Sequence, residues 1–303
     1  MRCQLTFKYQ GRNIMGALNY SAHAYAWTGS WSNRTLDIID KTASLGFDLI
    51  EIPLMELEGV DPPAIRKRLE DCGIGAVTST VCDERQDPTG EDERTRREGI
   101  DYLKSCVRKA AEIGSSFMSG VIYSAMGRRI DRIPGDVYWE RAAAALKEVA
   151  KFAQDYGIGI GIEPINRYES FLVNTAEQGL RLLRLIDEPN VKLHLDAYHM
   201  NIEENNFYDP TKLASPYLCH YHMSESHRGT VGTGTVNWDE IFRGLADGGY
   251  HGIVGMESFI EISPAMASGT CIWRKLADDT DKSLKDGLRF LKELEERYFK
   301  KQL

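Results

Sequence analysis

At five places along the chain, a helical pattern ends in glycine and a short apolar run begins within three residues. The five junctions read TASLG–FDLIEIP, LEDCG–IGAVTS, AAEIG–SSFMSGVIY, AQDYG–IGIGIEP and LADGGY–HGIVGMES. Glycine is the residue that most often takes the left-handed position closing a helix. The runs that follow are rich in Ile and Val, as buried parallel strands are. The pattern therefore predicts repeated strand–helix units built on a parallel sheet.

The same pattern extends to eight candidate strands. They cover residues 17–26, 47–53, 75–81, 116–123, 158–163, 191–196, 217–223 and 252–257. Eight units in 303 residues predict the α/β class and a single (β/α)8 TIM barrel, a fold of about 250 residues or more. We expect an N-terminal extension at 1–16 and the barrel domain at 17–303. The alternative is an open doubly wound sheet, but its GxGxxG fingerprint after the first strand is missing.

The charge and the cysteine pattern exclude several classes of partner. Acidic residues number 45 and basic residues 37, so the chain lacks the basic surface expected for binding nucleic acid or an anionic membrane. No apolar run approaches the roughly 18 residues of a membrane span, and no signal-peptide core is present. Six scattered cysteines without a CxxC pair are typical of reduced thiols. We therefore expect a cytoplasmic protein with neither nucleic-acid nor membrane partners.

Polar residues end four consecutive predicted strands, the fifth to the eighth. They are Glu163, Asp196, His222 and Glu257. Side chains alternate between the two faces of a strand, so bulky neighbours such as Ile162 and Leu195 would pack outward against helices. The four polar side chains would then point into the barrel at its carboxyl end, where barrel enzymes carry their active sites.

A metal ion explains this set better than isolated structural roles do. One acidic residue after a strand is usually a helix cap or a salt-bridge partner, but four polar residues in register are not. Three buried carboxylates would repel one another unless a divalent cation joined them. Oxygen ligands with one imidazole suit Mn²⁺ or Mg²⁺, with Co²⁺ possible. We expect His194 and His220, one pleat lower, to support the site rather than to bind the metal. Strand parity places Cys219 on the outer face.

Around these residues the chain resembles the ketose 3-epimerases, the D-tagatose/D-allulose 3-epimerase family of the xylose isomerase-like barrels. The matching segments are FDLIEIPLME, SGVIYSAM, GIEPINRYE, HLDAYHMNIEE, HYHMSESHRGTVGTG, VNWDEIF and the strand of Glu257. They run over most of the chain, from Trp27 to Trp273. HLDAYHMNIEE and SESHRGTVGTG are highly specific, and SGVIYSAM is most similar to the D-allulose and L-ribulose 3-epimerase members.

The resemblance implies roles for individual residues. The residues that match the family's metal ligands are Glu163, Asp196, His222 and Glu257. Of these, Glu163 and Glu257 also match the two catalytic acid/bases. The residues that match those holding the O1–O3 end of the ketose are Glu169 of NRYE, His199 of DAYH and Arg228 of SHRG. The resemblance further implies a metal-dependent enzyme, usually with Mn²⁺, that forms a homodimer or homotetramer.

The residues also predict a chemistry. The C3 proton of a 2-ketose becomes acidic when a cation polarises the neighbouring carbonyl and stabilises the resulting cis-enediolate. Glu163 and Glu257 come from strands five and eight and can approach C3 from different sides, so one can remove a proton and the other deliver one. Trp27, beyond strand one, is either part of an apolar wall for the far carbons of the sugar or an aromatic core or interface residue. Segment 260–281 is either a lid or an interface element.

Other functions stay open at this point. An aldose–ketose isomerase of the same barrel type, such as a hydroxypyruvate or rhamnose isomerase, would use similar ligands but move a proton between C1 and C2. A metal-dependent abasic-site endonuclease would need a multi-zinc, His-rich site and a basic groove, which the sequence supports poorly. A non-catalytic sugar-binding barrel would not need two carboxylates at one carbon. The sequence favours C3 epimerisation of a free ketose, either D-fructose to D-allulose or a D-tagatose or L-ribulose type of substrate.

Overall fold

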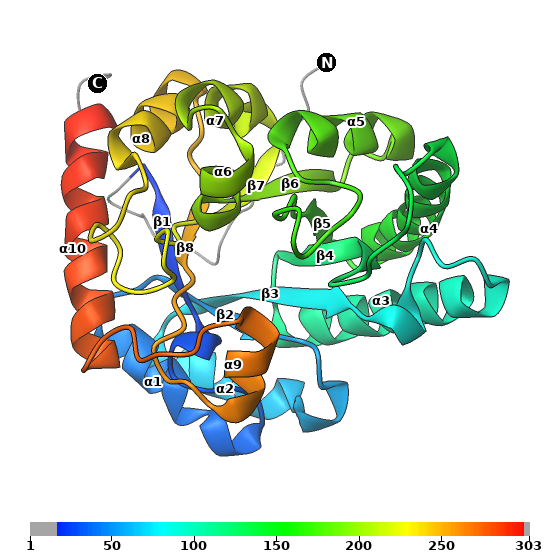
Figure 1. Ribbon diagram of the computed structural model, residues 1–303. Coiled ribbons are helices and arrows are strands. Elements are labelled where there is room, and N and C mark those ends of the chain that lie inside the picture. Colours follow the sequence, from blue (N-terminus) through cyan, green and yellow to red (C-terminus); the bar gives the residue numbers. More distant parts are fainter. Residues whose placement is uncertain (1–16, 300–303) are drawn as a thin grey trace.

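The computed structural model describes residues 17–299, and within them eight parallel strands form a closed barrel surrounded by helices (Figure 1). The strands follow chain order around the barrel, and the last pairs with the first. They are β1 Asn19–His23, β2 Leu49–Pro53, β3 Gly75–Cys82, β4 Phe117–Ala125, β5 Gly159–Ile162, β6 Val191–Asp196, β7 Leu218–His222 and β8 Ile253–Met256. The predicted (β/α)8 barrel is confirmed. The predicted N-terminal extension lies outside the described residues.

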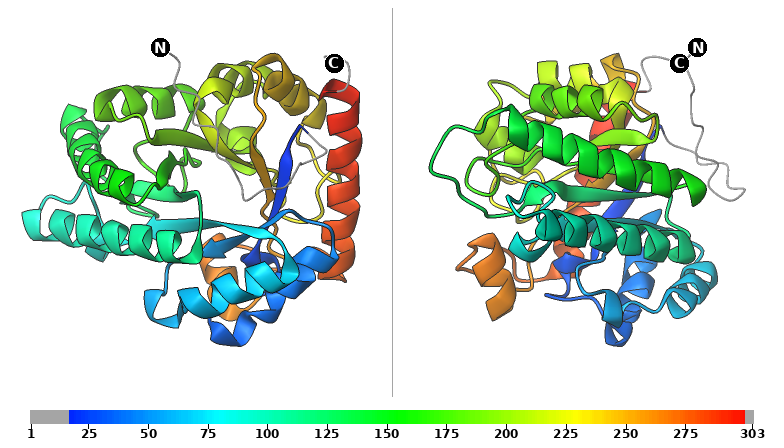
Figure 2. Two further views of the ribbon diagram at one scale, coloured as in Figure 1. Left: turned by 180° about the vertical axis from the view of Figure 1, so that it is seen from behind. Right: turned by 90° about the vertical axis from the view of Figure 1, so that its right-hand side faces the viewer.

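The longer helices cover the outer face of the barrel (Figure 2). They are α1 Asp37–Ser44, α2 Pro62–Cys72, α3 Glu93–Ile113, α4 Asp136–Asp155, α5 Ala176–Ile186, α8 Trp238–Asp247 and α10 Thr280–Phe299. The shorter α6 Ala197–Glu203 and α7 Tyr208–Ala214 follow β6, and α9 Pro264–Thr270 follows β8. The main apolar core joins strand residues such as Ile160 and Ile162 to helix residues such as Leu146 and Leu182. None of the helices in residues 17–299 combines the length and apolarity that a membrane crossing requires.

The predicted helix-closing glycines adopt left-handed backbone conformations. Their φ angles are 89° at Gly46, 67° at Gly73, 92° at Gly114, 68° at Gly157 and 69° at Gly249. A residue with a Cβ would be strained at such angles. Each glycine turns the chain from a helix into the next strand, at the rim where the strands begin. The carboxyl ends of the strands all lie at the other rim of the barrel.

The interior of the barrel is apolar at the amino ends of the strands. A small cluster there, separate from the main core, consists of Leu49, Val77, Phe117 and Cys219. The prediction that Cys219 faces outward is wrong. The register between β6 and β7 shifts between Leu193 and His194, and this irregularity breaks the alternation on which the prediction relied. The thiol instead approaches Gly161, where a Cβ would lie 2.8 Å from the sulfur.

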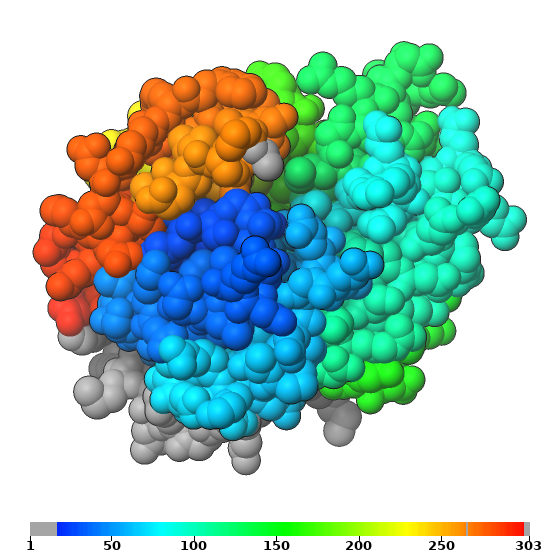
Figure 3. Space-filling view, turned by 90° about the horizontal axis from the view of Figure 1, so that it is seen from below, coloured from blue at the N-terminus to red at the C-terminus, as the bar shows by residue number. Residues whose placement is uncertain are grey.

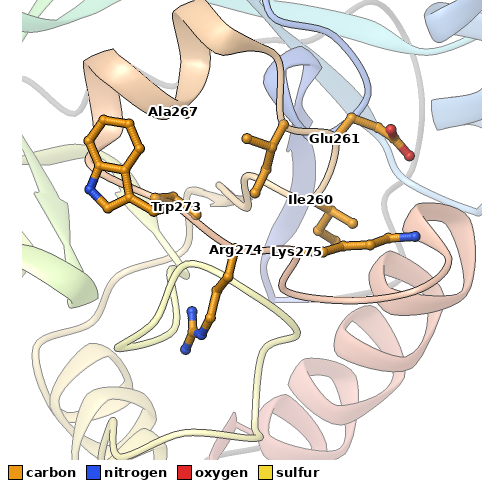
Figure 4. Close-up of a pocket in the computed structure, with 8 residues that line it drawn as sticks. Ile260, Glu261, Ala267, Trp273, Arg274 and Lys275 are labelled. Atoms are coloured by element: carbon orange, nitrogen blue, oxygen red, sulfur yellow. The ribbon is translucent and has the colours of Figure 1, made fainter.

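The connection after β8 folds back against the end of β1. The backbone N–H of Glu261 donates to the carbonyl of Ala26 over 3.4 Å, and Figure 3 shows this orange segment beside the blue one. A cavity of about 420 Å³ lies within the connection, lined in part by Ile260, Trp273 and Arg274 (Figure 4). None of the predicted site residues lines this cavity.

Candidate active site

The four polar residues that end β5 to β8 meet around one nitrogen atom, Nδ1 of His222. This atom lies 3.5 Å from Oδ2 of Asp196, 3.6 Å from Oε2 of Glu257 and 3.9 Å from Oε1 of Glu163. The parallel register sets Asp196 beside His222, and His222 beside the residue two before Glu257. Side-chain exposure is at most 13% in the four residues. The barrel therefore brings together the four predicted metal ligands.

The donor set fits a hard divalent metal ion. Nδ1 of His222 is buried and has no hydrogen-bond partner among residues 17–299. The other ring nitrogen, Nε2, lies 2.8 Å from Oε2 of Glu51. A carboxylate only accepts, so we assign a proton to Nε2, and Nδ1 is the nitrogen that faces the other carboxylates. One atom each from Glu163, Asp196 and His222 lies within 4.8 Å of the others, as ligands of a single ion must.

The two glutamates of this set have unlike electrostatic surroundings. Burial, reinforced by the carboxylates of Glu257 and Asp196, raises the pKa of Glu163 well above its usual value. Burial would also raise the pKa of Glu257, but Arg228 and His222 hold that pKa well below its usual range. Burial opposes the protonation of His222, yet Glu51 and Glu257 raise its pKa. A metal ion binding at Nδ1 would relieve the repulsion and displace a proton.

Arg228 supplies a positive charge beside these carboxylates. Its Nη1 lies 3.0 Å from Oδ2 of Asp196 and also pairs with Oε2 of Glu257. The guanidinium lies over the ring of Tyr198, 4.1 Å from its centroid. The backbone of Arg228 is left-handed, with φ 61°, a conformation that costs energy in a residue with a side chain and often marks functional sites.

The loop that presents Arg228 is organised by a buried carboxylate that the sequence analysis did not single out, Glu225. Its side chain accepts hydrogen bonds from the backbone of Ser226, Gly232 and Val236 and from the indole of Trp238. These bonds tie both ends of the loop to one side chain. The loop therefore holds Arg228 in place despite its unfavourable φ.

His199 and Glu169 are brought together by a second residue that the sequence analysis missed, Asn166. Its backbone N–H donates to Nδ1 of His199 over 3.1 Å, and its side-chain nitrogen donates to Oε1 of Glu169 over 2.7 Å. A backbone N–H can only donate, so Nδ1 of His199 accepts in this hydrogen bond. Burial lowers the pKa of His199, which favours the neutral ring. Nε2 of His199 lies 3.1 Å from Nη2 of Arg228, which can only donate, and 4.0 Å from Oε1 of Glu163.

A further missed residue is Glu51 of β2, which is fully buried. Its Oε2 lies 2.9 Å from Nε2 of His220 in addition to its contact with His222. The ring of His194 meets that of His222 edge-on with centroids 4.0 Å apart, and its Nδ1 lies 3.7 Å from Oε2 of Glu163. One ring nitrogen each of His194, His220 and His222 lies within 4.8 Å of the others, which makes them a second group that could hold an ion. A carboxylate within the apolar run FDLIEIP was a visible signal for Glu51, of the same kind as the residues that end β5, β6 and β8.

Trp27 lies just beyond the end of β1 and is half-buried. Its indole N–H donates to Oδ1 of Asp281 over 2.6 Å, which ties it to the start of α10. The neighbouring Tyr25 packs on the ring of His23 with centroids 4.8 Å apart. Trp31 is buried in the main core.

The chain is similar to known proteins over most of its length. The model of the xylose isomerase-like TIM barrel family matches residues 39–294, which include β2 to β8. Ketose 3-epimerase of Arthrobacter globiformis is 35% identical over 267 residues, covering 87% of this chain and 92% of that protein. L-ribulose 3-epimerase of Methylomonas sp. (strain DH-1) is 35% identical over 282 residues, covering 91% of this chain and 97% of that protein. The crystal structure of D-allulose 3-epimerase from Methylomonas sp. in complex with D-allulose is similar, with TM-score 0.87, 33% identity and coverage of 92% and 97%.

Proposed function

Since the chain belongs to the ketose 3-epimerases of the xylose isomerase-like TIM barrel family, we propose that it epimerises free ketoses at C3 with a bound Mn²⁺ ion. Co²⁺ and Mg²⁺ are the alternative metals, because the same oxygen-rich donor set accepts them. D-fructose, giving D-allulose, is the substrate we favour, with D-tagatose or L-ribulose as alternatives. The relatives support this range, since they are D-psicose (D-allulose) and L-ribulose 3-epimerases.

The observation that carries this proposal is the approach of two glutamates from non-adjacent strands to one imidazole nitrogen. Glu163, Asp196, His222 and Glu257 would hold the ion, which when bound supplies polarisation of the ketose carbonyl. Glu163 and Glu257 would then act as the acid/base pair. One takes the C3 proton to give an enediolate, and the other returns a proton to the opposite face of C3. Inversion at a single carbon needs two such groups.

The other predicted residues would bind the O1–O3 end of the sugar. Nη2 of Arg228 lies 3.1 Å from Nε2 of His199, so both side chains can contact the same substrate oxygen. The guanidinium of Arg228 would donate to that oxygen and stabilise negative charge that develops there. Glu169, held by Asn166, would accept from a hydroxyl. Trp27 would form part of the wall for the far carbons.

We place the enzyme in the cytoplasm, as a homodimer or homotetramer whose partner is a small-molecule ketose. The five cysteines within residues 17–299 are all free, as expected in a reducing compartment. Trp273 and Tyr168 are 74% and 68% exposed. Large exposed aromatic side chains of this kind are typical of subunit contacts.

The test is product analysis with and without metal. The purified protein is stripped of metal with EDTA, incubated with D-fructose with or without Mn²⁺, and the sugars are resolved by NMR. D-allulose formed only with metal is the expected result. An aldose would show an aldose–ketose isomerase instead. Failure to convert D-fructose, D-tagatose and L-ribulose in the presence of each of the three metals would contradict the proposal.

A further inference from the structure

We propose that Glu51 is a positioning residue of the metal site, which holds the imidazole of His222 so that Nδ1 faces Glu163, Asp196 and Glu257. This inference rests on the proposed function, because it takes those residues as ligands of one ion. Glu51 comes from β2, whereas the predicted ligands come from β5 to β8. Its side chain reaches across the barrel interior to His222 of β7. Its role would therefore be to act through His222 rather than on the sugar.

The contacts of Glu51 are closed off from water. Glu51 and His220 are 0% exposed, and His222 is 2% exposed. A single oxygen, Oε2, accepts from Nε2 of His222 over 2.8 Å and from Nε2 of His220 over 2.9 Å. Oε1 lies 3.7 Å from Nε2 of His23. Hydrogen bonds to a charged acceptor are stronger than neutral ones, and more so without competing water.

Glu51 decides which nitrogen of His222 is offered to the metal. A neutral imidazole carries its proton on one nitrogen, and only the other can bind an ion. The ring of His194 packs against that of His222. Neither ring nitrogen of His194 has a hydrogen-bond partner among the described residues, so His194 does not compete with Glu51 for the proton of His222. The carboxylate of Glu51 fixes the proton on Nε2 and leaves Nδ1 for the ion. A carboxylate bonded to a ligating histidine also raises the basicity of the ligand.

The barrel interior is built to hold Glu51 in this place. Register pairs Glu51 with His23 on one side and Val77 on the other. Gly255 of β8 leaves the space that His220 fills, since a Cβ at position 255 would lie 2.7 Å from Cε1 of His220. His220 in turn donates to the same oxygen as His222 does. The position of the carboxylate is therefore set by strands on both sides of it.

The test compares Glu51→Gln with the matched variant Glu295→Gln. Glutamine keeps the size of the side chain but removes the charge and one acceptor oxygen. Glu295 of α10 accepts from the backbone of Ala17 over 2.6 Å and from the hydroxyl of Tyr20 over 2.9 Å, at the amino-terminal end of the barrel. Both variants thus lose a carboxylate from a hydrogen-bond network, but only Glu51→Gln does so beneath His222.

Metal affinity is measured directly, without relying on turnover. Mn²⁺ is titrated into each metal-free protein, and free Mn²⁺ is followed by EPR. We expect Glu51→Gln to raise the Kd for Mn²⁺ by about 10- to 100-fold, the usual effect of losing such a partner, and to change the visible spectrum of the Co²⁺-loaded protein. Glu295→Gln should keep both the wild-type Kd and the wild-type spectrum.

A wild-type Kd and spectrum in Glu51→Gln would overturn the positioning role and leave the proposed function standing. Absence of Mn²⁺, Co²⁺ and Mg²⁺ binding by the wild-type protein would instead overturn the proposed function. If Glu51→Gln does not fold, ¹⁵N NMR of the histidine rings in Mg²⁺-loaded wild-type protein decides the question. A proton on Nε2 of His222, bonded to a carboxylate, is expected, and a proton on Nδ1 would overturn the inference.

Discussion

At the scale of single residues, the proposed chemistry depends on two glutamates whose surroundings differ. Glu163 faces like charges and its pKa is raised by burial, whereas Arg228 and His222 hold the pKa of Glu257 low. Pairs of carboxylates with unlike environments are a common feature of acid–base catalysis. Both groups approach the same nitrogen of His222, as the proposed action of both on one carbon requires.

We expect Glu163→Gln and Glu257→Gln each to lower kcat by about 10²–10⁴-fold, the usual contribution of a general acid or base. The assay uses saturating Mn²⁺, because each residue is also a proposed ligand. Glu204→Gln is the control, since Glu204 is a half-buried carboxylate that caps α5 through the backbone of Ala176. Either active-site variant retaining a tenth of the wild-type kcat would contradict the assigned roles.

Asn166→Ala tests the support of His199 and Glu169. The variant keeps the backbone N–H that bonds to His199. It loses the side-chain contacts of Asn166 with Glu169, with Nδ1 of His199 and with the backbone N–H of Tyr168. A single such bond contributes about 0.5–1.5 kcal/mol, so kcat/KM should fall by at least roughly 2- to 12-fold. Steady-state kinetics on D-fructose checks this. An unchanged kcat/KM, or a loss as large as that of Glu163→Gln, would show that Asn166 does not have the role described.

At the scale of strands and loops, local signals predicted the framework but missed contacts between distant segments. The helix-closing glycines and the apolar runs located all eight strands, and alternation pointed the four polar residues inward. Alternation failed for Cys219, because one irregular register step reverses the face of a side chain. Glu51 was missed because its partners lie on β7, about 170 residues further along the chain. Asn166 acts in part through its backbone N–H, and Glu225 binds mainly the backbone N–H groups of its loop. Such hydrogen bonds leave no pattern in the sequence.

The loop held by Glu225 should have a pH-dependent stability. Burial would raise the pKa of Glu225, but hydrogen bonds from the backbone of Ser226 and Val236 and from Trp238 lower it below the ordinary value of 4.5. The ionised carboxylate therefore stabilises the fold above the unfolded pKa, and this contribution is lost as the pH falls through the folded pKa. Glu225→Gln should lower the free energy of unfolding at pH 7, and the difference from wild type should shrink below about pH 4.5.

Urea unfolding of the two proteins at pH 7 and at pH 4 measures this difference. Other titrating groups are common to both proteins and cancel in the comparison. A difference of the same size at both pH values would contradict the account of the loop.

At the scale of the whole molecule, closure of the barrel brings together carboxylates that lie far apart in the sequence. Glu51, Glu163, Asp196 and Glu257 come from four strands and are buried together, with Arg228 as the adjacent guanidinium. The identity of the family was visible in short motifs of the sequence. The balance of charge around His222 was not, because it depends on distances between strands that only the closed barrel sets.

Metal binding should therefore stabilise the entire fold. A ligand at about 100 times its Kd adds about 2.7 kcal/mol to the free energy of unfolding. For a chain of 303 residues, this corresponds to a Tm rise of roughly 4 °C. We expect this rise on adding Mn²⁺ to the EDTA-treated protein, measured by differential scanning calorimetry. Asp196→Asn should abolish most of the rise, and an equal rise in that variant would contradict the proposed ligand set.

The most direct test of the central claim is the position of solvent hydrogen in the product. Wild-type protein with Mn²⁺ is incubated with D-fructose in D₂O, and early products are examined by NMR. We predict D-allulose that carries deuterium at C3 and none at C1, because the proton that Glu163 or Glu257 delivers has exchanged with solvent. Deuterium at C1, or D-allulose that keeps protium at C3, would contradict C3 epimerisation by these two glutamates.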